Sequence, residues 1–233
     1  MSSINQTIKK VILGLLGKGG KQQVLRLLLN DEEKTLLDFQ RSGYFVETGW
    51  FQSLSNRKPV DNNGHEIPWF TYPSVVFLDK RIQKGLKIFE YGSGASSLYF
   101  QAKGAALYSV EYDNAWFEKL KPSIKEPNKI FSVSYSKESP DAYVEAIDIP
   151  GIHFDIVVVD GRARVKCCKK AVDSLNATGI LILDDSERER YTECFSIMTQ
   201  KGFRYIEFWG ISAGDYNLKC TTVFYRPGNC LGI

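Results

Sequence analysis

Small residues and acids that could bind a nucleoside lie close together between residues 88 and 113. Glu90 precedes the turn Gly92-Ser93-Gly94-Ala95-Ser96, and a second apolar run ends on Glu111, followed by Tyr112. Glycines spaced as Gly-x-Gly let a backbone approach a ligand closely. An acid about 20 residues farther on, at the end of the next strand, can accept hydrogen bonds from both ribose hydroxyls. The spacing predicts a site for a cofactor that contains adenosine.

The acid at position 90 separates two kinds of cofactor. A dinucleotide site has three glycines, as Gly-x-Gly-x-x-Gly, because the pyrophosphate lies on the helix N-terminus. Here the third position is Ser97, and Glu90 would repel a pyrophosphate but could orient an ammonium group. The pattern resembles the class I S-adenosylmethionine (SAM) dependent methyltransferases, whose usual motif is acid-x-Gly-x-Gly-x-Gly; Ser96 stands at its last position.

The resemblance implies SAM as cofactor and methyl transfer, with the oxygen of a small-molecule or glycan-like acceptor as the expected target. The residues expected to hold SAM are Glu90, Gly92, Ser93, Gly94, Ser96, Glu111, Tyr112 and Asp160. Three alternatives remain. The turn could be an ordinary strand–helix connection, or the chain could be a non-catalytic nucleoside-binding or scaffold protein on the same fold. An NAD-dependent oxidoreductase is disfavoured by the missing third glycine and by Glu90.

Three further acids, Asp160, Asp184 and Asp185, follow apolar runs in the second half of the chain. Ligands of open α/β sheets bind outside the carboxyl ends of the strands, so these acids should share one crevice with the glycine turn. A carboxylate there can take the proton of an acceptor hydroxyl, and we expect Asp160 and Asp185 to be catalytic. The alternative is that each acid only caps the helix that follows its strand.

These acids also resemble the metal ligands of the catechol-type O-methyltransferases, which have an acid after strand four and Asp-Asn after strand five. Oxygen ligands suit Mg²⁺ or Ca²⁺. Here, however, the pair is Asp184-Asp185, and Arg162 and Arg164 could neutralise the acids. We therefore predict that no metal is bound and that activity survives a chelator.

The elements that would position these residues alternate between strand and helix from Leu86 onward, which predicts an α/β fold with a mostly parallel sheet and helices on both faces. The seven expected strands lie near residues 87–91, 106–111, 130–134, 154–160, 179–184, 203–209 and 220–226. The connection between the last two is too short for a crossover, so these two should form an antiparallel hairpin.

Residues 1–85 are expected to form an N-terminal helical extension, and residues 86–233 the SAM-binding domain. Trp69, Phe70 and Tyr72 could form a lid over the site, or they could anchor the extension in the core. His65 is a second candidate base only if the extension folds over the crevice; otherwise it is an exposed loop residue.

Charge and cysteine content limit the function classes. The net charge of +3 gives no reason to expect a nucleic-acid partner. Residues 1–30 carry five Lys and Arg and no acid, so this arm either touches an anionic surface or partner or is a solvated helical face. Five cysteines without a CxxC pair indicate reduced thiols and a cytoplasmic protein. We expect neither a signal peptide nor a transmembrane segment.

Overall fold

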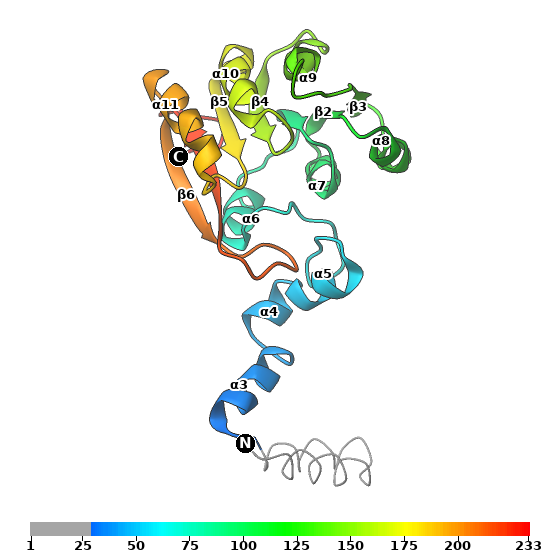
Figure 1. Cartoon of the computed structure of the whole chain (residues 1–233), viewed down its shortest axis with the longest axis vertical. Helices are drawn as coiled ribbons and strands as arrows, with labels where there is room; N and C mark the ends of the chain where they lie inside the picture. Colours follow the sequence, from blue (N-terminus) through cyan, green and yellow to red (C-terminus); the bar gives the residue numbers. More distant parts are fainter. Residues whose placement is uncertain (1–28) are drawn as a thin grey trace. The chain divides into compact units, whose positions relative to one another are not determined.

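The computed structural model describes residues 29–233 (Figure 1), so the five basic residues of the predicted arm and the start of the predicted helical extension lie outside the described residues. The chain divides into two compact units, residues 1–47 and 48–233. In the first unit, the described part holds α3 (Asp31–Phe39) and α4 (Tyr44–Glu47). Asn30 caps α3, because its side chain accepts from the Glu33 backbone N–H at 2.8 Å while the Glu33 carboxylate accepts from the Asn30 N–H at 3.0 Å.

The second unit is built on a seven-stranded sheet in the order β3-β2-β1-β4-β5-β7-β6. The strands are β1 (Lys87–Tyr91), β2 (Ala106–Glu111), β3 (Lys129–Ser132), β4 (Phe154–Val159), β5 (Leu175–Leu183), β6 (Arg204–Gly210) and β7 (Lys219–Tyr225). The first five strands are parallel, whereas β7 runs antiparallel to both β5 and β6. The predicted mostly parallel sheet with a C-terminal antiparallel hairpin is confirmed.

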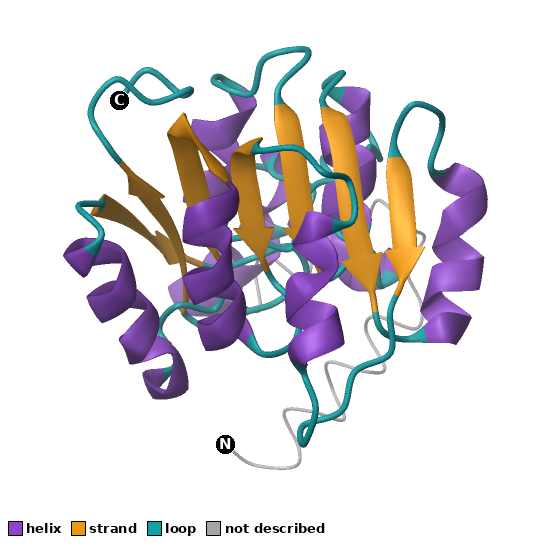
Figure 2. Ribbon diagram, turned by 90° about the horizontal axis from the view of Figure 1, so that it is seen from above, coloured by secondary structure: helices purple, strands orange, loops and turns teal. Residues whose placement is uncertain are grey.

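Helices cover both faces of this sheet (Figure 2). The longer ones are α5 (Trp50–Asn56), α6 (Tyr72–Asp79), α7 (Ala95–Ala102), α8 (Asn114–Leu120), α9 (Asp141–Glu145), α10 (Arg164–Ser174) and α11 (Thr192–Gln200). Successive residues of a strand point to opposite faces, so the apolar run of β4 serves two cores. Val157 and Val159 pack with α9, α10 and α11, whereas Ile156 and Val158 pack with α6 and α7.

The predicted domain boundary at residues 85 and 86 differs from the structure, in which residues 48–85 belong to the same compact unit as the sheet. Phe70 and Tyr72 are buried in the core that also holds Ile88 of β1. The Tyr72 N–H donates to the carbonyl of Ile211, beyond β6, at 2.9 Å. The apolar residues before β1 therefore complete one face of the sheet and do not form a core of their own.

No helix in the described part of the chain combines the length and the apolar character that crossing a membrane requires.

Candidate functional site

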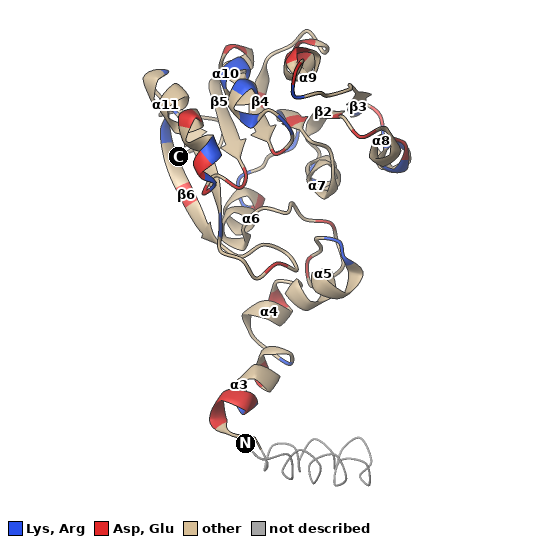
Figure 3. Ribbon diagram, in the orientation of Figure 1, with Lys and Arg blue, Asp and Glu red and all other residues tan. Residues whose placement is uncertain are grey.

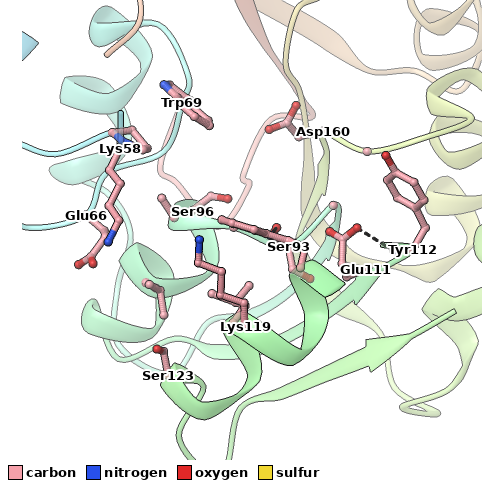
Figure 4. A pocket seen from close by; sticks show the side chains of 18 of the residues that line it. Lys58, Glu66, Trp69, Ser93, Ser96, Glu111, Tyr112, Lys119, Ser123 and Asp160 are labelled. Atoms are coloured by element: carbon pink, nitrogen blue, oxygen red, sulfur yellow. Dashed lines mark hydrogen bonds between the residues drawn. The ribbon is translucent and has the colours of Figure 1, made fainter. Parts of the chain in front are cut away.

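The carboxyl ends of β1, β2 and β4 meet at a pocket of about 510 Å³, which we call the glycine-turn pocket (Figure 4). Eight of the sequence-predicted site residues are brought to it or lie directly beneath it. Those that line it are Gly92, Ser93, Gly94, Ser96, Glu111, Tyr112 and Asp160. Glu90 is the exception, because it lies beneath the turn.

The two glycines of the turn have different reasons to be glycine. Gly92 has a φ of +92°, and a Cβ there would lie 2.9 Å from the Cα of Gly161, in the loop after β4. Gly92 thus allows the turns after β1 and β4 to touch. At Gly94 a Cβ would meet no atom of the described residues within 4 Å, so it would project into open space beside the pocket. That space is available to a ligand.

Glu90 is fully buried and lines neither pocket of the site. Its carboxylate accepts from the Ser97 hydroxyl, and that hydroxyl accepts from the Gly94 N–H at 3.0 Å. Burial raises the pKa of Glu90 to about 8, although the hydroxyls of Ser96 and Ser97 favour its ionised form. The structure therefore gives Glu90 the role of supporting the turn, in place of the expected contact with an ammonium group.

Glu111 is held at the end of β2 by its own backbone. One carboxylate oxygen accepts from the N–H of Tyr112 at 2.9 Å (Figure 4) and from the N–H of Asp113 at 2.8 Å. Burial raises the pKa of Glu111, and the backbone N–H groups oppose this rise. A carboxylate fixed in this way is preorganised to accept hydrogen bonds from a ligand in the pocket.

Three further features of the pocket bear on ligand binding. Sequence reasoning missed Trp116, an aromatic residue in the helix that follows Glu111; its indole N–H donates to the Ser93 carbonyl at 2.9 Å. The Ser93 hydroxyl is buried and has no hydrogen-bond partner among the described residues. Buried polar groups are normally satisfied, so this hydroxyl is available to a ligand. Tyr112 accepts from the Arg162 guanidinium, which lies 4.6 Å from its ring centroid.

A second pocket of about 620 Å³, the acidic pocket, adjoins the first. It is lined by Ser53, Leu54, Arg57, Trp69, Asp160, Asp184, Asp185, Ser212, Ala213, Gly214, Asp215 and Lys219. The two pockets share Arg57, Trp69 and Asp160. Oxygen atoms of Asp160, Asp184 and Asp185 lie within 4.8 Å of one another, so the predicted convergence of these acids is observed.

The three acids do not cap the helices that follow their strands. The residue before α10 is Ala163, and the residue before α11 is Tyr191; neither helix has a side-chain cap. Asp185 instead adopts a φ of +51°, a left-handed conformation that is uncommon for a residue other than glycine. Backbone strain of this kind concentrates at functional sites.

Acidic and basic residues alternate along the ribbon between β5 and α11 (Figure 3). Basic side chains form ion pairs with these acids. Arg164 lies 2.8 Å from Asp160 and 3.2 Å from Asp185, so it pairs with the acids, whereas Arg162 pairs with Tyr112. Sequence reasoning missed two other cations. Arg188 lies 2.8 Å from Asp185. Lys219 lies 2.8 Å from Asp185 and 3.4 Å from Asp184. Lys219 opens β7, whose antiparallel direction returns its first residue to this edge of the sheet.

These surroundings give the three acids different pKa values. Burial raises the pKa of Asp160, with Arg164 acting against the rise. Burial and the neighbouring Asp160 raise the pKa of Asp184 to about 7. Burial acts to raise the pKa of Asp185 as well, but Lys219, Arg164 and Arg188 outweigh it and hold this pKa below its usual value. Asp185 is thus fixed as a carboxylate, whereas Asp160 holds a proton more readily.

The residues before β1 contribute one aromatic side chain to both pockets. Trp69 is half-exposed, and its indole N–H donates to the Ala213 carbonyl at 2.9 Å. Phe70 and Tyr72 are buried core residues, which agrees with the anchor interpretation. His65 is exposed, pairs with Asp61 and lines neither pocket, so its position does not support a role as a base.

No protein-family profile matches the sequence, and no curated protein matches it. Solved structures do resemble it. Precorrin-6y C5,15-methyltransferase from Geobacter metallireducens superposes with a TM-score of 0.50 at 12% identity, over 66% of this chain and 87% of that one. The fold is that of the class I methyltransferases.

Two other solved structures illustrate the range of this likeness. A methyltransferase from Pyrococcus furiosus has a TM-score of 0.48 at 17% identity, over 76% of this chain and 93% of that one. Magnesium protoporphyrin IX methyltransferase from Synechocystis, solved with bound SAM, has a TM-score of 0.46 at 12% identity, over 94% and 97%. At these identities the likeness concerns the fold alone, so function must be argued from the site.

Proposed function

We propose that this protein is a SAM-dependent methyltransferase that acts on an oxygen of a small-molecule or glycan-like acceptor. One observation carries the proposal: the glycine-turn pocket opens beside the acidic pocket, and Asp160 and Trp69 border both. A donor in the first pocket and an acceptor in the second would meet at Asp160. Methyl transfer is an in-line displacement, which requires two ligands held side by side.

The glycine-turn pocket fits SAM by three features. The open space at Gly94 lets the ligand approach the backbone. Glu111 is fixed to accept from both ribose hydroxyls, and the unpartnered Ser93 hydroxyl offers a further polar contact. Trp116 adds a flat apolar surface for the base. When bound, SAM would supply an activated methyl group on its sulfonium.

Asp160 is the base in this proposal. It lies where the pockets meet, and its raised pKa makes it a better proton acceptor than Asp185. Arg164 orients the Asp160 carboxylate through an ion pair of 2.8 Å. Asp185 supports the site indirectly, because it holds Lys219 and Arg188 in place. This differs from the sequence-based expectation, which treated the two acids alike.

The acidic pocket suits a neutral, hydroxyl-rich acceptor. Carboxylates can accept from hydroxyls, cationic side chains can donate to them, and the half-exposed ring of Trp69 offers an apolar face. The absence of a nucleic-acid partner stays a proposal, and the RNA arm of the turnover assay described below tests it. The cation pairs already neutralise the acids of this pocket, so we propose that turnover needs no metal.

Two assignments outside the pockets also remain proposals. Within the predicted extension, Arg57 and Trp69 line both pockets, and we propose that the segment 57–69 closes over the acceptor. We also propose that the protein is cytoplasmic, because its five cysteines are free and three of them are buried in one core.

The test is turnover of methyl-labelled SAM with a panel of free sugars, nucleotide sugars and catechols, and with RNA as a separate arm. We expect S-adenosylhomocysteine to form with a hydroxylated small molecule and not with RNA. SAM binding without transfer to any acceptor would instead favour a non-catalytic nucleoside-binding protein. Labelling of RNA alone would overturn the proposed acceptor class.

A further inference from the structure

Lys219 has an unusual position for a lysine side chain. It is the first residue of β7, its side chain is only 14% exposed, and it borders the acidic pocket. Its ammonium lies 2.8 Å from Asp185 Oδ1 and 3.4 Å from Asp184 Oδ2. Both contacts are ion pairs, so the side chain brings a positive charge to the two carboxylates.

The acids around it have the ligand type and spacing that could hold a divalent cation. Asp160, Asp184 and Asp185 bring oxygen atoms within 4.8 Å of one another, and hard oxygen ligands suit Mg²⁺, Mn²⁺ or Ca²⁺. Three carboxylates this close cannot all be ionised without a neighbouring positive charge. Arg164 and Arg188 approach Asp160 and Asp185, and among the described residues only Lys219 forms an ion pair with Asp184. Lys219 therefore supplies the charge that a metal would supply at Asp184.

An ammonium group has three N–H donors. Within the described residues the Lys219 ammonium donates one hydrogen bond, to Asp184 Oδ2 at 3.4 Å, and its contact with Asp185 Oδ1 at 2.8 Å is an ion pair, so it retains donor capacity toward a ligand. A purely structural ion pair would be closed off from both pockets, yet Lys219 lines the acidic pocket together with Asp160 and Trp69. Its position allows one group to hold the acids and also contact an acceptor.

We propose that the Lys219 ammonium takes the place of a divalent cation in acceptor binding, neutralising the acids and donating a hydrogen bond to the acceptor oxygen. The second half of this proposal rests on the proposed function. As the acceptor hydroxyl gives its proton to Asp160, its oxygen gains negative charge and forms the new C–O bond. The C–S bond breaks and its electron pair goes to sulfur. A fixed cation beside the oxygen stabilises that developing charge.

The activity-independent test is Mn²⁺ binding, measured by electron paramagnetic resonance on the full chain. Lys219→Ala should expose the three carboxylates and bind Mn²⁺ at least about tenfold more tightly than the wild type. Lys219→Met fills the lost volume and should behave in the same direction, which controls for collapse of the site. Lys170→Ala is the matched control, because Lys170 pairs with one carboxylate, Asp148, at 2.6 Å outside both pockets. It should bind no more Mn²⁺ than the wild type.

The activity test uses the acceptor identified in the turnover assay. Lys219→Ala should raise the acceptor KM and lower kcat at least about tenfold while SAM affinity stays the same. Added methylammonium or Mn²⁺ should restore part of the loss, and Lys219→Arg should retain more activity than Lys219→Ala. A merely structural lysine would not allow such rescue.

The two proposals fail in different ways. Unchanged Mn²⁺ binding in both Lys219→Ala and Lys219→Met would overturn the replacement of a metal by Lys219, whatever the activity. An unchanged acceptor KM and kcat would overturn the contact with the acceptor. If the wild type transfers no methyl group to any acceptor, the proposed function fails, and the contact between Lys219 and the acceptor fails with it. Mn²⁺ binding still decides whether Lys219 takes the place of a divalent cation.

Discussion

Replacing Glu90 by Gln tests whether Glu90 supports the glycine turn as a protonated, neutral side chain or as a carboxylate. The two side chains have nearly the same shape, so Glu90→Gln removes only the ability to ionise. Glu90 is fully buried at the end of β1, and its pKa is raised from 4.5 to about 8, first by burial and further by Asp160 and Glu111. The hydroxyls of Ser96 and Ser97 offset only part of this rise.

The sign of the effect follows from proton binding. Between pH 4.5 and about 8 the folded protein keeps a proton on Glu90 that the unfolded chain releases. The folded state therefore binds more protons, and its stability falls as the pH rises through this window. The fall is about 1.4 kcal/mol per pH unit where the difference is one full proton. Over the whole window it has an upper limit of about 5 kcal/mol, since water penetration and relaxation reduce the shift.

Urea unfolding at pH 5, 6, 7 and 8 measures this effect as the difference in free energy of unfolding between Glu90→Gln and the wild type. We expect the variant to gain relative stability at each step toward pH 8. Glu118→Gln is the matched control, because Glu118 is exposed, and its difference should stay flat. A difference for Glu90→Gln that does not change with pH would mean that Glu90 is ionised in the folded protein, which contradicts the argument from burial.

Four other substitutions test how the pockets are built. Gly92→Ala should lower the free energy of unfolding by about 2 kcal/mol or more, because its φ is positive and the Cβ would meet Gly161. Gly94→Ala should fold normally yet bind SAM more weakly, because its Cβ would project into open space beside the pocket. Thermal unfolding measures the first effect and calorimetry the second. Asp160→Asn should still bind SAM but lose at least about 100-fold in kcat, which is the usual contribution of a general base. EDTA should leave the wild type active. Loss of activity in EDTA and its rescue by Mg²⁺ would refute the metal-free mechanism. Trp69→Ala should raise the acceptor KM more than the SAM dissociation constant, and equal changes in both would remove its role in the acceptor pocket.

The sequence predicted the sheet well because its signals are local. Apolar runs bounded by turns mark all seven strands, and the connection of residues 211–218 after β6 is too short for a parallel crossover. The boundary predicted at residues 85 and 86 differs from the compact units for a nonlocal reason. An apolar stretch before the first strand can build its own core or cover a neighbouring sheet, and only packing decides that Phe70 and Tyr72 cover this sheet.

The same distinction separates the predicted and missed parts of the site. The glycine turn and the acids at strand ends are adjacent to their strands in sequence, so their convergence followed from the parallel sheet. Lys219 and Trp116 reach the pockets from elements whose placement depends on tertiary packing. The complete burial of Glu90 could not be predicted either, because the sequence does not reveal that the Ser97 hydroxyl and the turn cover its carboxylate.

The central claim is that the glycine-turn pocket binds SAM, and calorimetry with SAM, S-adenosylhomocysteine and NAD tests it most directly. We expect the wild type to bind the first two ligands and not NAD. Glu111→Ala should weaken SAM binding by about 1–3 kcal/mol, because hydrogen bonds from both ribose hydroxyls to a fixed carboxylate are lost. Binding of NAD without binding of SAM would contradict the account, and an unchanged SAM dissociation constant in Glu111→Ala would remove Glu111 from the pocket's function.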